Sequence, residues 1–191
     1  MFLVNGGSGA GSAEYSDCFH INSPLYDMIR LLKRGVTMLR IMQVDPSMEI
    51  SFRHYQLSLK QMFFAGHPAY IINRKRSNYF PFVILKDDEI IGAFALERGA
   101  ILSVMDAPKT AIYLRGLSLD SRHQGKGYFR KVLQELERYI NEQDPDITDL
   151  YLMVNVNNDN GYYAFIKSGF IDRQKTVKQS LVTLKVLSKS L

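Results

Sequence analysis

The sequence predicts a mixed α/β domain, and three patterns along its 191 residues support this fold class. An apolar run over Ala111–Leu119 leads through a glycine-containing turn into a segment whose apolar residues recur every three or four positions, as on one face of a helix. Two further apolar runs, Phe80–Leu85 and Ile90–Leu96, flank a polar turn and predict a β-hairpin. Strands and helices therefore alternate along the chain, which is typical of α/β proteins.

The elements before the hairpin are expected to be one strand and one helix. A strand is predicted over Val36–Val44. Asp45-Pro46 fits a helix start, with Asp45 as N-cap, and this helix is expected to end at Gly66. Its apolar face would consist of Phe52, Tyr55, Leu59, Met62 and Phe63. His67-Pro68 is expected in the loop that follows.

The elements after the hairpin alternate until the chain closes on two strands. Residues Gly99–Ala107 either extend the hairpin or cross to the next strand. The predicted elements are then the strand Thr110–Leu119, the helix Gly127–Asn141, the strand Thr148–Val156, the helix Asp159–Lys167 closed by Gly169, and the antiparallel pair Phe170–Val177 and Leu181–Leu187.

Composition limits the class of protein. An apolar share of 46% supports a sizeable core. No run approaches the roughly 18 apolar residues of a membrane span, so no membrane association is expected. Cys18 is the single cysteine, which excludes an internal disulfide and a cysteine-based metal site and fits a reducing cytoplasm. We expect residues 1–35 to be a flexible or weakly helical extension and residues 36–191 to form the domain.

The net charge of +5 favours an anionic ligand without identifying it. A nucleic-acid-binding domain is one interpretation, but the basic residues are scattered and no nucleic-acid motif appears. A small anionic cofactor needs only local positive charge, and the segment around Gly125 supplies it through Arg122, Lys126, Arg130 and Lys131.

The turn between the central strand and its helix predicts a phosphate-binding site. It begins at Arg122 and contains Gly125 and Gly127, which have no Cβ and let an anion approach the backbone. The amides at the start of a helix are unpaired and lie at the positive end of its dipole. The segment has neither the Gly-Lys-Ser/Thr ending of a P-loop nor the spacing of a dinucleotide-binding turn. An ordinary strand-to-helix turn with two glycines is the alternative.

Two motifs together resemble the GCN5-related N-acetyltransferase (GNAT) superfamily. The first is Arg122-x-x-Gly125-x-Gly127, which matches the acetyl-CoA pyrophosphate motif of that family. The second lies downstream, where Asn158 follows a predicted strand and a short helix closes with Gly169-Phe170. The resemblance runs from about residue 38 to the end of the chain and is strongest over Tyr113–Phe170.

The resemblance implies a fold, a cosubstrate and a set of binding residues. It implies a mixed, mostly antiparallel sheet of six to seven strands with a central parallel pair that splays apart, flanked by about four helices. The cosubstrate would be acetyl-CoA, and the enzyme would be an acetyltransferase that moves the acetyl group to a primary amine within a ternary complex. The family's cofactor-binding positions correspond here to Leu117, Ser118, Leu119, Arg122, His123, Gln124, Gly125, Lys126, Gly127, Tyr128 and Asn158.

The chain departs from the family pattern at two positions. A third small residue is usual two places after the second glycine, and Phe129 stands there. A tyrosine that protonates the leaving thiolate is frequent five places before the Phe of Gly-Phe, and Phe165 stands there. Tyr162, one turn earlier, is a candidate catalytic acid, with Tyr163 as its neighbour. Glu97 is the candidate catalytic base, although a surface glutamate at a turn is the alternative.

Several alternatives stay open at the level of function. A non-catalytic CoA-binding or regulatory module with the same fold is the rival that Phe165 favours. The acceptor is a small-molecule or peptide amine, and polyamines, aminoglycosides, amino acids and protein lysines all fit. In this family the acceptor side usually lies between the first two strands, where His54, His67, Tyr70 and the cluster Arg74–Arg76 occur. A solvated loop that does not touch substrate is the alternative for each of these residues. No nucleic acid or membrane partner is expected, and a homodimer is an open alternative.

Overall fold

The computed structural model describes residues 38–45 and 47–191, which belong to one compact unit. The extension expected over residues 1–35, including Cys18, and the first residues of the strand expected from Val36 lie outside this part of the chain. The proposed boundary near residue 36 therefore stays a prediction.

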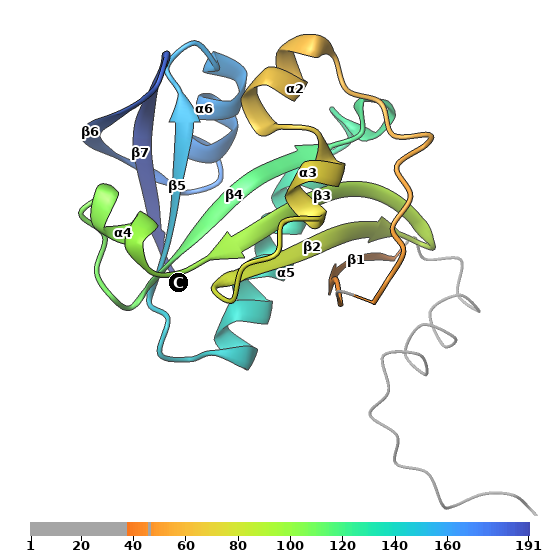
Figure 1. Ribbon diagram of the computed structural model, residues 1–191, viewed down its shortest axis with the longest axis horizontal. Helices are drawn as coiled ribbons and strands as arrows, with labels where there is room; N and C mark the ends of the chain where they lie inside the picture. The colour runs from red at the N-terminus through yellow and green to blue at the C-terminus, as the bar shows by residue number, and fades with distance from the viewer. Residues whose placement is uncertain (1–37, 46) are drawn as a thin grey trace, which may run out of the picture. The chain divides into compact units, whose positions relative to one another are not determined.

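A seven-stranded mixed sheet forms the centre of the molecule (Figure 1). Its strand order is β1-β2-β3-β4-β5-β7-β6, and only β4 and β5 pair in parallel. The strands are β1 Leu39–Gln43, β2 Tyr79–Lys86, β3 Glu89–Glu97, β4 Ala111–Leu119, β5 Asp149–Asn155, β6 Ile171–Gln179 and β7 Val182–Ser190. The predicted mixed sheet, with its central parallel pair, is thus confirmed.

Helices cover both faces of this sheet. They are α2 Leu59–Ala65, α3 Pro68–Ile72, α4 Ala100–Val104, α5 Tyr128–Gln143 and α6 Asp159–Ile166, with a 3-10 turn at Ser121–His123. α5 lies behind the sheet and α3 in front of it in Figure 1. The apolar side chains of α5 and α6 belong to the largest core cluster, on the rear face. Two smaller clusters on the front face involve α3 and α4.

The large rear core explains why the longest helix packs there. Val132, Leu133, Leu136 and Ile140 recur along one side of α5, and all four are buried. They pack against side chains of β2 to β5 that alternate with front-facing residues, as the two-residue period of a strand requires. This packing fixes the N-terminus of α5 relative to the end of β4.

The helix expected from Asp45 to Gly66 is shorter than predicted. No residue from Ser47 to Ser58 is helical, and α2 begins only after Ser58. The reason is a capping box, in which Ser58 and Gln61 each accept a hydrogen bond from the other's backbone amide. Asp45 instead accepts the amide of Ser47 at 2.8 Å in a local turn. The expected end at Gly66 is confirmed.

His67-Pro68 was expected in a loop, and this expectation is wrong. His67 caps the short helix α3, since its Nδ1 accepts the amide of Ala69 at 3.2 Å. Pro68 stands at the first helical position, where its missing N–H costs no hydrogen bond. The segment Gly99–Ala107, whose structure was open, contains α4 and connects β3 to β4.

β4 and β5 separate halfway along their length. Their pairing ends at Leu114 opposite Leu152, after four residue pairs. Beyond this point β4 continues against β3, while β5 continues against β7. A register shift between Ala93 and Ala95 of β3 accompanies the change, opposite Gly116, whose φ is +63°. The splay expected of the parallel pair is therefore present, and it opens toward the N-terminus of α5.

Candidate functional site

The turn before α5 holds two glycines in a backbone conformation that other residues rarely adopt. Gly125 has a φ of +71° and Gly127 a φ of +77°. A Cβ built on either glycine would meet no atom within 4 Å. The space over both residues is therefore open, and a ligand can reach the backbone there.

The amides of this turn have no acceptor among the residues that the structure describes. Within the described part of the chain, no hydrogen bond is formed by the backbone N–H groups from Gly125 to Arg130. Gly127 is the N-cap of α5, and no side chain in the described part of the chain caps the helix. Unpaired amides at the start of a 16-residue helix make a favourable site for an anion.

Arg122, expected to grip phosphate, is bound elsewhere. Its guanidinium donates to both carboxylate oxygens of Asp120, at 3.0 and 2.8 Å, and to the carbonyl of His54 at 3.0 Å. It also lies 3.3 Å from Glu89. The Arg122 side chain thus ties the turn to β3 and to the segment before α2. These contacts hold the turn in its conformation.

Asp120 is the buried centre of this arrangement. It caps the 3-10 turn by accepting the amide of Arg122 at 2.9 Å, and it also accepts the amide of Gln56 at 3.1 Å. Burial alone would raise the pKa of Asp120, but the hydrogen bonds from Arg122 and Gln56 lower it to about 2. The carboxylate is therefore ionised throughout the neutral range.

Some of the remaining residues of the turn form contacts within the protein, and others are exposed. The Gln124 side chain donates to the carbonyl of Leu119 at 2.6 Å and accepts from Gln61 at 2.7 Å, which ties α2 to the end of β4. His123 is buried, with Nε2 at 3.4 Å from Glu89. Lys126 is exposed beside the glycines. Tyr128 is half-buried, its ring centroid 6.2 Å from that of His123.

Leu117, Ser118 and Leu119 occupy the part of β4 that has left β5. The Leu117 side chain packs on the rear core. Ser118 is buried, and its Oγ lies 2.9 Å from the hydroxyl of Tyr55, in the segment before α2. Among the described strands, none pairs with the edge of β4 that faces β5 over these residues, and a peptide-like ligand can add there as a further strand.

Asn158 closes the opposite side of the gap. It follows β5 and caps α6, since its Oδ1 accepts the amide of Gly161 at 3.1 Å. No hydrogen bond is recorded for its Nδ2 among the described residues, so the amide group keeps a donor for a ligand.

The two candidate catalytic residues are both bound to partners. The Tyr162 hydroxyl donates to Asp172 of the edge strand β6 at 3.1 Å, and Lys185 lies 4.4 Å from its ring centre. Burial, and then the hydrogen bond to Asp172, raise the pKa of Tyr162. Because β5 and β7 lie between β6 and β4, this hydroxyl is directed away from the gap.

Glu97 is not a surface residue at a turn, so that alternative is wrong. It is the last residue of β3 and only 4% exposed. Its Oε2 lies 2.8 Å from Nε of Arg115 on β4, and its Oε1 lies 3.6 Å from Arg76. Both carboxylate oxygens therefore face guanidinium groups.

Comparison with known proteins identifies the family of this chain. Residues 44–170 match the Acetyltransferase (GNAT) family. The chain belongs to the GNAT family. The Uncharacterized N-acetyltransferase YbbJ of Bacillus subtilis (strain 168) is 35% identical over 96 residues, which are 49% of this chain and 59% of YbbJ. The aligned region thus spans less than two thirds of that relative.

Solved structures of GNAT proteins share the fold at low sequence identity. An IAA acetyltransferase from Bacillus cereus ATCC 14579 gives a TM-score of 0.54 at 12% identity, over 81% of this chain and all of that one. AAC(6')-Ib, solved with ribostamycin and coenzyme A, gives 0.53 at 17% identity, over 64% of this chain and 68% of that one. At these identities the likeness concerns the fold alone.

Three residues of this GNAT domain near the site were not predicted from its sequence. Tyr55 reaches Ser118 from the segment before α2. Tyr79, on β2, and Arg115, on β4, lie on the front face with Glu97. The only signal in the sequence was Arg115, a charged residue inside an otherwise apolar strand. The contacts of the two tyrosines depend on tertiary structure.

Three further observations concern the GNAT domain outside this site. A hollow lined by Phe80, Arg98, Tyr139 and Asp144 lies at the far end of α5 from the glycine turn. In the part of the chain that the structure covers, no group of three His, Cys, Asp or Glu residues is arranged to hold a metal ion. Among the described helices, none has the length and apolar character needed to cross a membrane.

Proposed function

We propose that this chain is an acetyltransferase that takes acetyl-CoA as cosubstrate and acetylates a primary amine. The observation that carries the proposal is the set of unpaired amides from Gly125 to Arg130, exposed by two glycines and placed where β4 and β5 diverge. Membership of the GNAT family and solved relatives with coenzyme A bound support it.

The residues present fit the cosubstrate in two places. The amides of Gly125 to Arg130 would hold the pyrophosphate, because they are free and lie at the positive end of the α5 dipole. The open edge of β4 at Leu117–Leu119 and the amide group of Asn158 would hold the peptide-like arm. Bound acetyl-CoA supplies an acetyl group activated as a thioester.

The protein's contribution to the reaction is positioning. Transfer to the neutral amine forms a carbon–nitrogen bond, breaks the carbon–sulfur bond, and releases coenzyme A as a thiolate together with one proton from the amine nitrogen. The backbone of β4 near Leu117 or Ser118 can donate to the thioester carbonyl. No cysteine lies among residues 38–45 and 47–191, which favours direct transfer to the amine within a ternary complex over a covalent relay.

Neither candidate catalytic side chain is free in this arrangement. Glu97 holds Arg115 in place, since both its carboxylate oxygens face guanidinium groups. The Tyr162 hydroxyl is bound to Asp172 on the far edge strand. The proposal therefore assigns proton transfer to solvent at the open end of the gap, with coenzyme A leaving as a thiolate.

The test is isothermal titration of acetyl-CoA into the full chain and into Gly125→Glu and Gly127→Glu. A carboxylate over these amides repels the diphosphate and removes charge-assisted hydrogen bonds, so we expect affinity to fall by about 30-fold or more. Gly169→Glu is the matched control, since Gly169 is exposed and also has a positive φ, of +91°. Unchanged affinity in both cradle variants contradicts the proposal.

Catalysis is tested separately from binding. The full chain is incubated with acetyl-CoA and a panel of primary amines, and released thiol is measured. Binding of acetyl-CoA without thiol release for any amine would favour the rival function of a non-catalytic CoA-binding module.

A further inference from the structure

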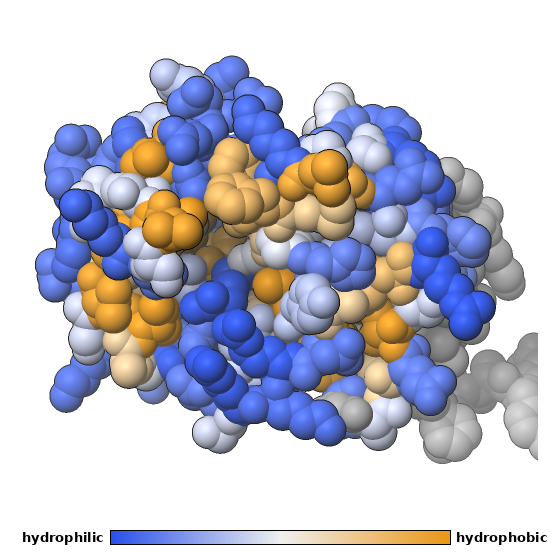
Figure 2. Space-filling model, turned by 45° about the horizontal axis from the view of Figure 1, so that its top comes forward, coloured by the Kyte–Doolittle hydropathy of each residue, from blue (hydrophilic) through white to orange (hydrophobic). Residues whose placement is uncertain are grey.

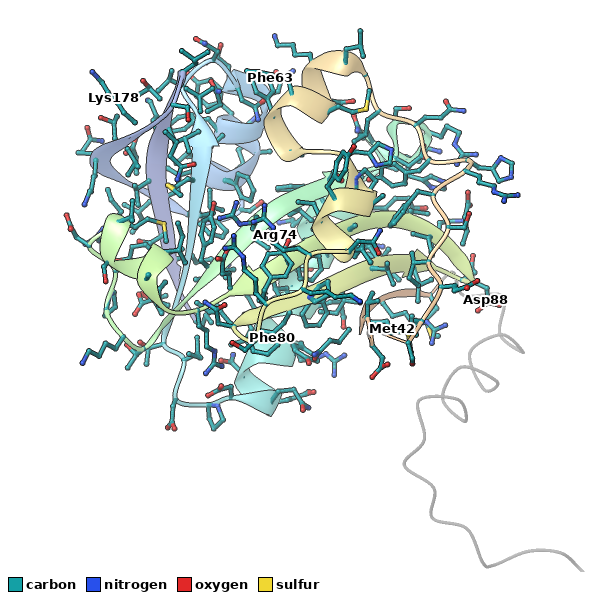
Figure 3. The ribbon with its side chains drawn as sticks, viewed as in Figure 1. Met42, Phe63, Arg74, Phe80, Asp88 and Lys178 are labelled. Atoms are coloured by element: carbon teal, nitrogen blue, oxygen red, sulfur yellow. The ribbon has the colours of Figure 1, made fainter. Side chains whose placement is uncertain are left out.

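Charged and aromatic side chains gather on the front face of the sheet, next to the gap. Glu97 and Arg115 form an ion pair across β3 and β4, at 2.8 Å, and Arg76 approaches the same carboxylate at 3.6 Å. Arg74 lies over the ring of Tyr79, with 5.5 Å between its guanidinium carbon and the ring centre. Figure 3 shows the Arg74 side chain in front of the central strands, beside α3. We call these five residues the arginine cluster.

The hydroxyl of Tyr79 is a buried polar group within the arginine cluster. It is 4% exposed, and its hydroxyl forms no hydrogen bond within the part of the chain that the structure describes. Burial raises the pKa of Tyr79, while the nearby guanidinium groups of Arg74 and Arg115 act against that rise. A buried hydroxyl without a hydrogen-bond partner is a costly arrangement that a ligand can relieve.

The arginine cluster lies where an acceptor would have to enter. Arg115 is the first residue of β4 beyond the last β4–β5 pair, and its side chain shares the front face with Glu97. The rear face is filled by α5, α6 and the main core. The surface is hollowed beside α2, on the side where β4 and β5 diverge (Figure 2). An amine that reaches the gap from the front passes the arginine cluster.

The charge of the arginine cluster selects among amines. The arginine cluster holds three guanidinium groups and one carboxylate, and that carboxylate is paired with Arg115 and Arg76, while Arg74 lies over the Tyr79 ring. A polycationic amine would be repelled here, whereas an anionic group on the acceptor would gain bidentate, charge-assisted hydrogen bonds. The Arg74 and Arg76 side chains are exposed and so are accessible to a ligand.

We propose that the acceptor is a primary amine that also carries a carboxylate, such as an amino acid or a peptide, and that Arg74, Arg76 and Tyr79 bind this carboxylate. The inference rests on the proposed function, because it names the substrate class of the same site. Arg115 presents the rest of the anion-binding surface and is held in place by Glu97.

The test measures carboxylate binding without requiring the natural acceptor. N-acetyl derivatives of glycine, leucine and phenylalanine resemble the products, and each has a neutral counterpart in its amide. Each pair is titrated into the full chain with coenzyme A present, and binding is followed by NMR of the arginine Nε–H groups. We expect at least one acid to bind about tenfold or more tightly than its amide.

The variant Arg74→Met/Arg76→Met should remove this preference while acetyl-CoA still binds with unchanged affinity. Lys75→Met is the matched control, since it removes a positive charge from an exposed residue between the two arginines and should keep the preference. Equal binding of every acid and its amide, or no saturable binding of either, overturns the inference. So does faster acetylation of spermidine than of any carboxylate-bearing amine, a result that leaves the proposed acetyltransferase function standing. Failure of acetyl-CoA to bind the unmodified chain would instead count against the proposed function.

Discussion

Phe129 and Phe165 pack edge to face, with 5.1 Å between ring centroids and an interplanar angle of 69°. These are the two positions at which the chain departs from the GNAT pattern, one at the start of α5 and one on α6. The two departures from the family pattern therefore contact each other in the structure. The Phe165 ring also meets Phe170 at 5.3 Å, so the pair extends the rear core to the edge of the site.

The first prediction is that Phe129 and Phe165 are energetically coupled. In a double-mutant cycle with Phe129→Ala and Phe165→Ala, the coupling should be about 0.5–1.5 kcal/mol, as measured for aromatic pairs. The free energy of unfolding of the four proteins by urea gives this value. The same cycle on Phe63 and Phe64 is the control, because Phe63 is 67% exposed. Additive effects at Phe129 and Phe165 would show that the contact contributes nothing beyond burial.

A second prediction concerns Tyr162. Because its hydroxyl donates to Asp172 and points away from the gap, Tyr162→Phe should change kcat by no more than about twofold, where loss of a general acid costs about 100-fold or more. Tyr163→Phe, the neighbouring and more exposed tyrosine, is the control. The measurement is thiol release at saturating acetyl-CoA and acceptor, from pH 6 to about pH 9. A large loss of kcat confined to Tyr162→Phe would assign the acid role to this residue.

The order of elements from β2 onward, α4 excepted, could be predicted because local patterns there agree with the tertiary structure. The strand predicted over Thr148–Val156 does place Leu150, Leu152 and Val154 in the core, and the glycines at 125 and 127 do precede α5. One failure lay at His67-Pro68, which begins α3. Another lay between Asp45 and Ser58, where apolar residues at helical spacing are held by other contacts. Tyr55, for example, bonds Ser118, which lies 63 residues further along the chain.

The candidate site likewise has one part that could be predicted from the sequence and one part that could not. The glycine turn is local and could be predicted from its sequence. The use of Arg122 could not, because its partners Glu89 and the His54 carbonyl come from distant segments. Glu97 was identified as a candidate without the two arginines that surround it, since nothing in the sequence places Arg115 and Arg76 on the same carboxylate.

A third prediction follows from Gly116, which forms the irregular point of β4. Its φ is +63°, and a Cβ there would lie 2.5 Å from Cδ1 of Ile71 and 3.0 Å from the carbonyl oxygen of Ala65. Gly116→Ala therefore combines backbone strain with displacement of α2 and α3, and it should lower the free energy of unfolding by about 1–3 kcal/mol. Gly125→Ala, where the Cβ meets open space, isolates the backbone term. Equal losses in the two variants would show that contact with α3 is unimportant.

The last prediction is a pH dependence of stability that originates at Asp120. This carboxylate is fully buried, and four hydrogen bonds from Arg122 and Gln56 reach its oxygens. Its pKa is lowered from 3.8 to about 2 in the folded protein, so folding favours the ionised form. The resulting stabilisation is complete above the unfolded-state pKa and is lost as the pH falls through about 4 toward 2.

Asp120→Asn should cost about 2 kcal/mol at neutral pH and should flatten the decline of stability below about pH 5. Urea unfolding at several pH values measures both effects, with Asp88→Asn as the control because the Asp88 side chain is 77% exposed. If the parent and Asp120→Asn lose stability in parallel as the pH falls, the hydrogen bonds of Arg122 do not stabilise this carboxylate in the way described.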